Sequence, residues 1–149
     1  MWVKTPPEVP HVSHQITLEL MADMASLETA DRALDEFATR MAWSETALFQ
    51  LRLVLEEIMM NVISYGSDGA TIPQVRLHLV QEGAALSMEI ADDGVAFDPL
   101  QAPAPDLDAD IDDRPIGGLG VFLVRELMDS VTYLREAGWN RLSVTKTLS

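Results

Sequence analysis

The sequence predicts an α+β fold of the two-layer sandwich type, with a mixed, mostly antiparallel sheet covered on one face by helices. Five segments alternate apolar and polar residues, as half-buried strands do, and three place apolar residues at helical spacing. Along the chain they read strand, helix, helix, hairpin, loop, helix, hairpin. This order lacks the repeated strand–helix–strand units of a doubly wound parallel sheet, so that architecture is disfavoured.

The N-terminal half is expected to hold one strand and two helices. Residues 1–11 carry three prolines and little pattern, which is typical of a flexible arm. Residues 14–20 alternate as a half-buried strand, and residues 24–41 have the apolar spacing of a helix. Ser44 is the expected N-cap of a long second helix, which runs to about Tyr65 and stops at a glycine-rich turn.

The C-terminal half is expected to form two hairpins with a long loop and a helix between them. The paired strands are expected at 75–80 with 86–90, joined by a turn at 81–83, and at 131–134 with 141–146, joined at 137–138. Residues 98–117 are rich in Pro and Asp and have no regular period, which is typical of a lid or a binding loop. A helix then opens at the glycine stretch 117–120.

The composition indicates one folded domain, expected over residues 12–149, in a reducing cytoplasm. The chain has 149 residues, is 48% apolar and contains no cysteine, which excludes disulfides, thiolate zinc sites and cysteine nucleophiles. The net charge of −14 argues against a nucleic-acid partner. The acidity can serve a basic protein partner or simply solubility. No stretch approaches the roughly 20 apolar residues of a membrane helix, and the N-terminus lacks the apolar run of a signal peptide.

The most informative helix segment is 53–66, because two polar residues lie beside its apolar stripe. Glu57 and Asn61 are four residues apart, so their side chains point the same way from successive turns. Glu56 points about 100° away from Glu57 around the helix. A solvated helix face is the ordinary interpretation of such residues. The functional interpretation is a ligand site, since polar groups at the edge of a core-facing stripe need partners.

Two glycine-containing segments are compatible with ligand binding without matching a nucleotide fingerprint. Gly118 and Gly120 are followed by Leu123 where the dinucleotide fingerprint needs glycine, and no Gly-Lys-Ser/Thr supports a Walker loop. Small residues at a helix N-terminus still leave N–H groups free for an anion, or they form a plain hinge. Asp92 and Gly94 end a predicted strand, and indicate either a turn or a carboxylate that accepts a hydrogen bond from a ligand.

Taken together, these segments resemble the motifs of the GHKL (Bergerat-fold) ATPase superfamily, in particular its small anti-sigma-factor serine/threonine kinases. The matching segments are 57–61, 92–99, 117–129 and, more weakly, 140–146. The resemblance extends over most of the chain, from about the first strand to Lys146. Two departures are Ala96, where many members have glycine, and Ser64–Tyr65, which replace a histidine-containing ending.

The resemblance implies a role for each matching residue. Asn61 would present its carboxamide oxygen to Mg²⁺, which takes few protein ligands besides phosphate oxygens. Glu57 would be the general base, acting on a Ser/Thr hydroxyl in a kinase or on water in an ATPase. Asp92 would accept a hydrogen bond from the adenine amino group, and Gly94 would let the backbone approach the purine.

The phosphate contacts would come from the lid and the helix that follows it. Gly118 and Gly120 would leave N–H groups free for the phosphates. Arg114 would be brought to the γ-phosphate when the lid closes. The full set expected to bind the nucleotide is Asn61, Asp92, Gly94, Phe97, Arg114, Gly117, Gly118, Leu119 and Gly120.

The leading hypothesis is an ATP- and Mg²⁺-dependent serine/threonine protein kinase that acts as an anti-sigma factor. It would hold a sigma factor and phosphorylate an anti-anti-sigma partner of the STAS type. The alternative is a non-kinase ATP-binding regulatory module that sequesters a protein partner and changes its affinity for that partner when the lid closes. A histidine-kinase fragment is disfavoured, because no phospho-acceptor helix pair precedes the domain. Members of this branch are often homodimers, so a homodimer is expected.

Overall fold

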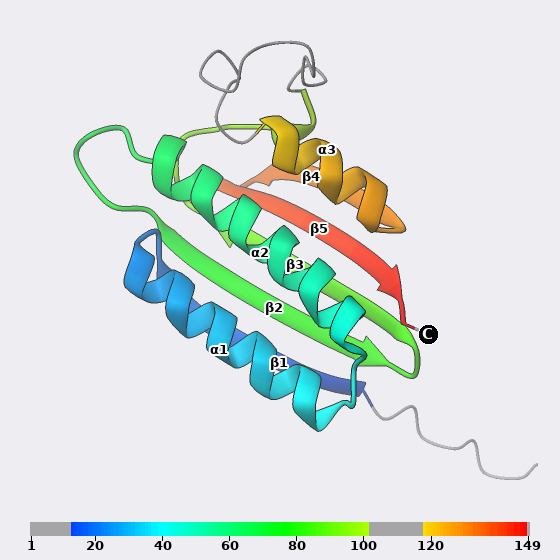
Figure 1. The fold of residues 1–149 in the computed structure, drawn as a ribbon. Coiled ribbons are helices and arrows are strands. Elements are labelled where there is room, and N and C mark those ends of the chain that lie inside the picture. The colour runs from blue at the N-terminus through cyan, green and yellow to red at the C-terminus, as the bar shows by residue number, and fades with distance from the viewer. Residues whose placement is uncertain (1–12, 102–117, 149) are drawn as a thin grey trace, which may run out of the picture.

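The computed structural model describes residues 13–101 and 118–148 (Figure 1). Its elements follow the predicted order. They are β1 (Ser13–Met21), α1 (Met24–Arg40), α2 (Glu45–Tyr65), β2 (Gln74–Glu82), β3 (Ala85–Asp92), the short 3₁₀ helix η1 (Pro99–Gln101), α3 (Gly118–Leu127), β4 (Ser130–Glu136) and β5 (Trp139–Thr147). The expected N-terminal arm and most of the expected lid lie outside the described residues.

The described strands form one sheet in the order β1-β2-β3-β5-β4. Both expected hairpins are present, β2 with β3 and β4 with β5. Because β5 lies between β3 and β4, Asp92 at the end of β3 is opposite Asn140 at the start of β5. The three helices cover one face of the sheet (Figure 1), which confirms the predicted two-layer α+β fold. Every pairing of the described strands is antiparallel, so this sheet has no mixed character.

The apolar core lies between the sheet and the helices. Alternation along β2 points Val75, Leu77 and Leu79 at the helices, and each is at most 1% exposed. From the helix side, α2 contributes Leu51 and Leu55, which are fully buried. Truncating one such leucine to alanine costs about 2–5 kcal/mol of stability. The core therefore fixes α2 firmly against the centre of the sheet.

Both ends of α2 are set by the residues that the sequence indicated. The Ser44 hydroxyl accepts a hydrogen bond from the Ala47 backbone N–H at 3.1 Å, as an N-cap does. At the other end, the Gly66 N–H donates to the Val62 carbonyl at 2.8 Å. Gly66 is buried at the end of the sheet, and its carbonyl is left to bond with a neighbouring segment.

The turn between β2 and β3 was predicted at 81–83, and that boundary was wrong. β2 continues to Glu82, and the turn is formed by residues 83–84. Gln81 stays in the strand because its side chain is buried and hydrogen-bonded through both its oxygen and its nitrogen. Its Oε1 accepts from Trp43 Nε1 at 2.7 Å, and its Nε2 donates to the Gly83 carbonyl at 2.9 Å.

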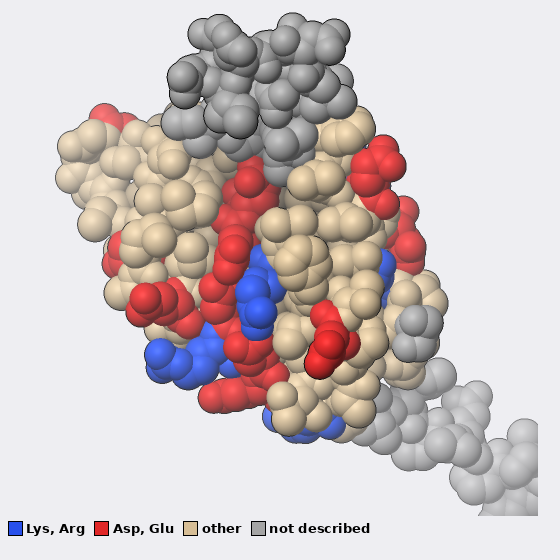
Figure 2. Space-filling view, in the orientation of Figure 1, with Lys and Arg blue, Asp and Glu red and all other residues tan. Residues whose placement is uncertain are grey.

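Acidic side chains form a band down the helical face, with basic side chains directly beside it (Figure 2). Asp31 and Asp35 belong to α1 and Glu56 belongs to α2. Arg52 of α2 forms an ion pair with Asp35 within this acidic band. Three carboxyl groups thus lie around one arginine where these two helices meet.

Candidate functional site

A small pocket lies where α2 and β3 end. Its walls come from the C-terminal half of α2, the end of β3, the segment after β3, and the β4–β5 hairpin. The lining residues are Ile58, Asn61, Val62, Tyr65, Gly66, Ile90, Asp92, Val95, Phe97, Pro99, Tyr133, Asn140 and Leu142. Three of the predicted ligand-binding residues, Asn61, Asp92 and Phe97, thus meet at one pocket.

Helix α2 places Asn61 on the pocket wall and Glu57 one turn earlier on the same face. Asn61 is only 7% exposed. One carboxylate oxygen of Glu57, Oε1, is buried and has no hydrogen-bond partner among the described residues. Burial raises the pKa of Glu57 above its ordinary value, while a hydrogen bond with the Asn61 side chain acts in the opposite direction. The chain therefore keeps a partly desolvated carboxyl group beside the pocket.

Asp92, at the end of β3, is the buried carboxylate of the pocket. It is 7% exposed, and its Oδ1 accepts hydrogen bonds from Gly94 N at 3.0 Å and from Asn140 Nδ2 at 2.9 Å. Both bonds reach Oδ1, and no other described residue donates a hydrogen bond to Oδ2. Burial raises the pKa of Asp92, and the bonds from Asn140 and Gly94, together with the charge of Arg135, oppose that rise.

Gly94 is required by the close approach of two backbone segments. A Cβ atom at this position would lie 2.5 Å from the Gly66 carbonyl oxygen and 2.9 Å from Asp92 Oδ1. The same Gly66 oxygen accepts a hydrogen bond from Val95 N at 2.9 Å, which ties the segment after β3 to the end of α2. The fold therefore explains this glycine on its own, and its contact with a purine stays a prediction.

Two aromatic side chains stack at the pocket. Tyr65, on the last turn of α2, and Phe97 have ring centroids 5.9 Å apart and planes inclined by 29°. Both rings line the pocket and are more than a third exposed. The departure noted at Ser64–Tyr65 thus has a structural consequence, because Tyr65 contacts the segment that enters the predicted lid.

The glycine stretch opens a helix, as predicted. Gly118, Leu119 and Gly120 form the first turn of α3, whereas Arg114 and Gly117 lie outside the described residues. The start of α3 lies at the same end of the molecule as the C-terminus of α2 (Figure 1). Arg125 of α3 donates from Nη2 to the carbonyl of Leu100, which holds η1 against α3.

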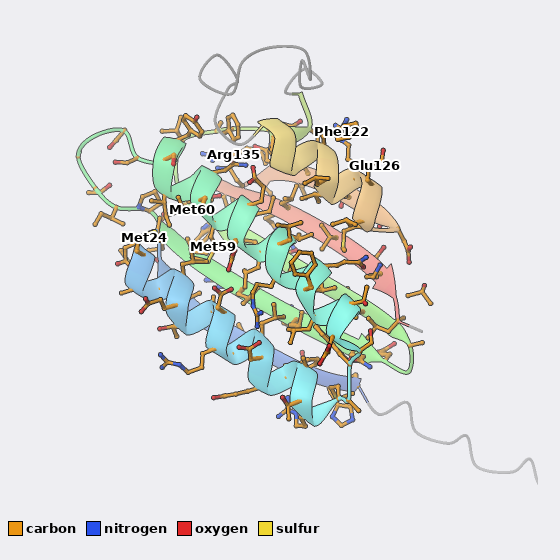
Figure 3. All side chains as sticks on the ribbon, viewed as in Figure 1. Met24, Met59, Met60, Phe122, Glu126 and Arg135 are labelled. Carbon is orange, nitrogen blue, oxygen red and sulfur yellow. The ribbon has the colours of Figure 1, made fainter. Side chains whose placement is uncertain are left out.

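Sequence reasoning missed three side chains that build this site. Tyr133 and Asn140 line the pocket, and Arg135, labelled in Figure 3, donates from Nη1 to the Gly94 carbonyl at 2.9 Å. A signal for Asn140 was present, because it shares the inward side of β5 with Leu142 and Val144. A polar residue at an apolar position of an alternating strand needs buried partners.

The pocket joins a buried carboxylate at a strand end to a polar helix face. The family model of the histidine kinase-like ATPase domain matches residues 20–146. The chain belongs to this family. The motif resemblance found in the sequence is thereby confirmed, and membership of this ATPase family implies that the protein binds ATP.

Two relatives of this histidine kinase-like ATPase carry the names of protein kinases. Serine/threonine-protein kinase BtrW of Bordetella bronchiseptica is 36% identical over 129 residues, which cover 87% of this chain and 91% of BtrW. Serine-protein kinase RsbW of Listeria monocytogenes is 27% identical over 128 residues, covering 83% of this chain and 82% of RsbW. These names bear out the expected serine/threonine kinase and do not favour the non-kinase alternative.

A solved structure shares the fold. The crystal structure of the RsbU and RsbW domains of Rv1364c from Mycobacterium tuberculosis matches with a TM-score of 0.67 and 12% sequence identity. The match covers 91% of this chain and 32% of that longer chain. At this identity the likeness concerns the fold alone, and it agrees with the two-layer architecture described above.

In this histidine kinase-like domain, the described residues contain no group of three or more His, Asp or Glu side chains placed to hold a metal ion. Within residues 13–101 and 118–148, no helix is long and apolar enough to cross a membrane.

Proposed function

We propose that this protein is an ATP- and Mg²⁺-dependent serine/threonine kinase that acts as an anti-sigma factor. It holds a sigma factor and phosphorylates a serine or threonine of an anti-anti-sigma partner of the STAS type. The proposal rests on the kinase-type relatives and, within this chain, chiefly on Glu57.

Glu57 carries the argument because its Oε1 is buried without a partner in the described structure. An unpaired buried carboxylate oxygen is costly, and such groups persist where a ligand completes them. A hydroxyl that approaches Oε1 would supply the missing hydrogen bond and lose its proton to the carboxylate. The raised pKa of Glu57 improves it as a proton acceptor near neutral pH.

Asn61 fits a metal ligand because its amide is buried on the pocket wall, one helical turn from Glu57. A neutral carboxamide oxygen is a hard donor that suits Mg²⁺. When bound, the ion would neutralise charge on the transferred phosphoryl group. The spacing on α2 places the proton acceptor and the metal ligand on a single rigid element.

Asp92 and α3 would bind the two ends of the nucleotide. Asp92 Oδ2 is the acceptor for the adenine amino group, because Oδ1 is already occupied by Gly94 and Asn140. The N–H groups of the first α3 turn, from Gly118 to Gly120, are those that a helix leaves unpaired and that favour phosphate. Arg114 and Gly117 are assigned to the phosphates on the motif match alone.

The acidic band between α1 and α2 supports a protein partner with a basic face. Asp31, Asp35 and Glu56 lie around Arg52 on these two helices, and opposite charges accelerate encounter between two proteins. Association through it would weaken as salt rises. The homodimer remains a prediction of the family resemblance, and the cytoplasmic location remains a prediction of the composition.

Transfer of labelled phosphate tests the kinase. The full chain is incubated with γ-labelled ATP, Mg²⁺ and a STAS-type partner from the same genome. Glu57→Gln should lower the transfer rate by roughly 10²–10⁴-fold with ATP affinity nearly unchanged. Glu82→Gln is the matched control, because Glu82 is exposed at the far end of β2 from the pocket, and it should transfer normally. Tight ATP binding without label on the partner would contradict the kinase and leave a sequestering module.

A further inference from the structure

The side chain of Asn140 uses its whole hydrogen-bonding capacity inside the site. It is 5% exposed and lies opposite Asp92 in the sheet register. Its Nδ2 donates to Asp92 Oδ1 at 2.9 Å and to the Val95 carbonyl at 2.8 Å. Its Oδ1 accepts from the Tyr133 hydroxyl at 2.6 Å and from Phe97 N at 3.3 Å. A carboxamide offers two donors and two acceptor sites, so none is left over.

Of the two bonds to Oδ1, the one from Tyr133 is much the better. A distance of 2.6 Å is at the short end for an O–H···O bond, whereas 3.3 Å exceeds the usual range for N–H···O. Tyr133 is also held on a strand, with its ring against the pocket. The tyrosine is therefore the main anchor of the Asn140 oxygen, and it fixes the plane of the amide.

The orientation of that amide decides how Asp92 is presented. While Oδ1 of Asn140 is anchored on Tyr133, the Nδ2 hydrogens point at Asp92 and Val95. The Asn140 amide thus donates a hydrogen bond to Asp92 Oδ1, which leaves Oδ2 to accept a hydrogen bond from the purine. A freed amide would hold the carboxylate less well, and hydrogen bonds in such a chain strengthen one another.

We propose that Tyr133 is a positioning residue that acts through Asn140 to hold Asp92 for selection of a 6-amino purine over a 6-oxo purine. A 6-amino group can donate a hydrogen bond to Asp92 Oδ2. A 6-oxo group cannot, because its oxygen and Oδ2 are both acceptors and repel each other. The inference rests on the proposed nucleotide site, and it adds the residues that set the selectivity of that site.

Tyr133→Phe is the sharper variant, because Asn140 also holds the backbone of Val95 and Phe97 and its loss would loosen that segment. Thr132→Val is the matched control, since Thr132 is the adjacent β4 residue and points to the other side of the sheet. Calorimetry on the full chain measures the affinities of ATP and of inosine triphosphate, which carries a 6-oxo group. A thermal melt checks that each variant is folded.

Tyr133→Phe should lower the affinity for ATP about three- to tenfold and leave the affinity for inosine triphosphate unchanged. The ratio of the two affinities should therefore fall by the same factor. Thr132→Val should change neither affinity. Equal weakening of both nucleotides, or no change in either, would overturn the proposal, because a merely structural tyrosine would not favour one base.

A measurement without nucleotide separates this proposal from the proposed function. The Asp92 carboxyl is titrated by carbon NMR in the wild-type protein and in both variants. Tyr133→Phe should raise the pKa of Asp92 further, because the opposing bond from Asn140 weakens while Asp93 and Arg135 stay in place. An unchanged pKa would overturn the relay. A raised pKa in a protein that binds no ATP would support the relay and refute the kinase.

Discussion

Replacing Asp31 by asparagine should stabilise the protein at neutral pH and leave its stability unchanged in acid. Asp31 lies on α1, and its Oδ1 is buried without a hydrogen-bond donor in the described structure. It faces Glu56 of α2, and two carboxyl groups form a hydrogen bond only when one of them holds a proton. Burial, and to a smaller extent the hydrogen bond and charge of Glu56, raise the pKa of Asp31 from 3.8 to about 6. The charge of Arg52 acts in the opposite direction.

The sign follows from proton linkage. The folded state holds the Asp31 proton more tightly than the unfolded state, so stability falls as pH rises from 3.8 to about 6. Taken at face value, this shift costs the fold about 3 kcal/mol above that window. The side chain is only partly buried, and solvent screening reduces the expected cost to about 1 kcal/mol. Asparagine donates to Glu56 as the protonated acid does, so Asp31→Asn should recover that amount.

Urea unfolding at about pH 8 and about pH 4 measures this difference in each variant. Glu36→Gln, an exposed change on the same helix, is the control for the removal of one negative charge from a chain of net charge −14. The gain in the free energy of unfolding should be larger for Asp31→Asn than for the control only at the higher pH. An equal gain at both pH values, or a loss at the higher one, would refute the reasoning about the shared proton.

Three further expectations concern the pocket. Gly94→Ala should abolish ATP binding in a calorimetric titration, because the new Cβ atom would lie 2.5 Å from a backbone oxygen. Gly83→Ala is the control: its Cβ atom meets open space, so this variant should bind ATP normally despite the strain in its backbone. A double-mutant cycle of Tyr65→Leu and Phe97→Leu should give a coupling of about 0.5–1.5 kcal/mol in urea unfolding; additive effects would exclude the stack. Asn61→Ala should raise the Mg²⁺ concentration needed for tight ATP binding, and an unchanged Mg²⁺ dependence would remove Asn61 as the ligand.

The fold was predictable because its signals are local. Alternation along residues 75–80 and the apolar stripe of α2 follow directly from burial on one face. Ser44 marks the start of α2 through its own hydroxyl, so the helix boundary is visible in the sequence. The turn at 81–83 was misplaced because Gln81 is held in β2 by Trp43, 38 residues earlier in the chain. No local pattern reports such a distant hydrogen bond.

The site was predictable only where residues carry a motif. Glu57, Asn61 and Asp92 belong to matching segments, and the structure brings Asn61 and Asp92 to one pocket. Tyr133 escaped notice because a tyrosine in an alternating strand is ordinary until its hydroxyl is seen to meet Asn140. The strand order β3-β5-β4, which joins these residues, results from long-range pairing that spacing along the chain does not specify.

In the proposed site, the arrangement of α2 would let one helix serve both ends of the nucleotide. Its middle turns carry Glu57 and Asn61, and its last residue, Tyr65, stacks on Phe97. The Gly66 carbonyl that follows binds Val95 N, next to the residues that hold Asp92. A shift of α2 along its axis would therefore displace the proposed base, metal ligand and purine contact together. Because fully buried leucines lock α2 to the sheet, core packing supplies the rigidity on which the proposed chemistry depends.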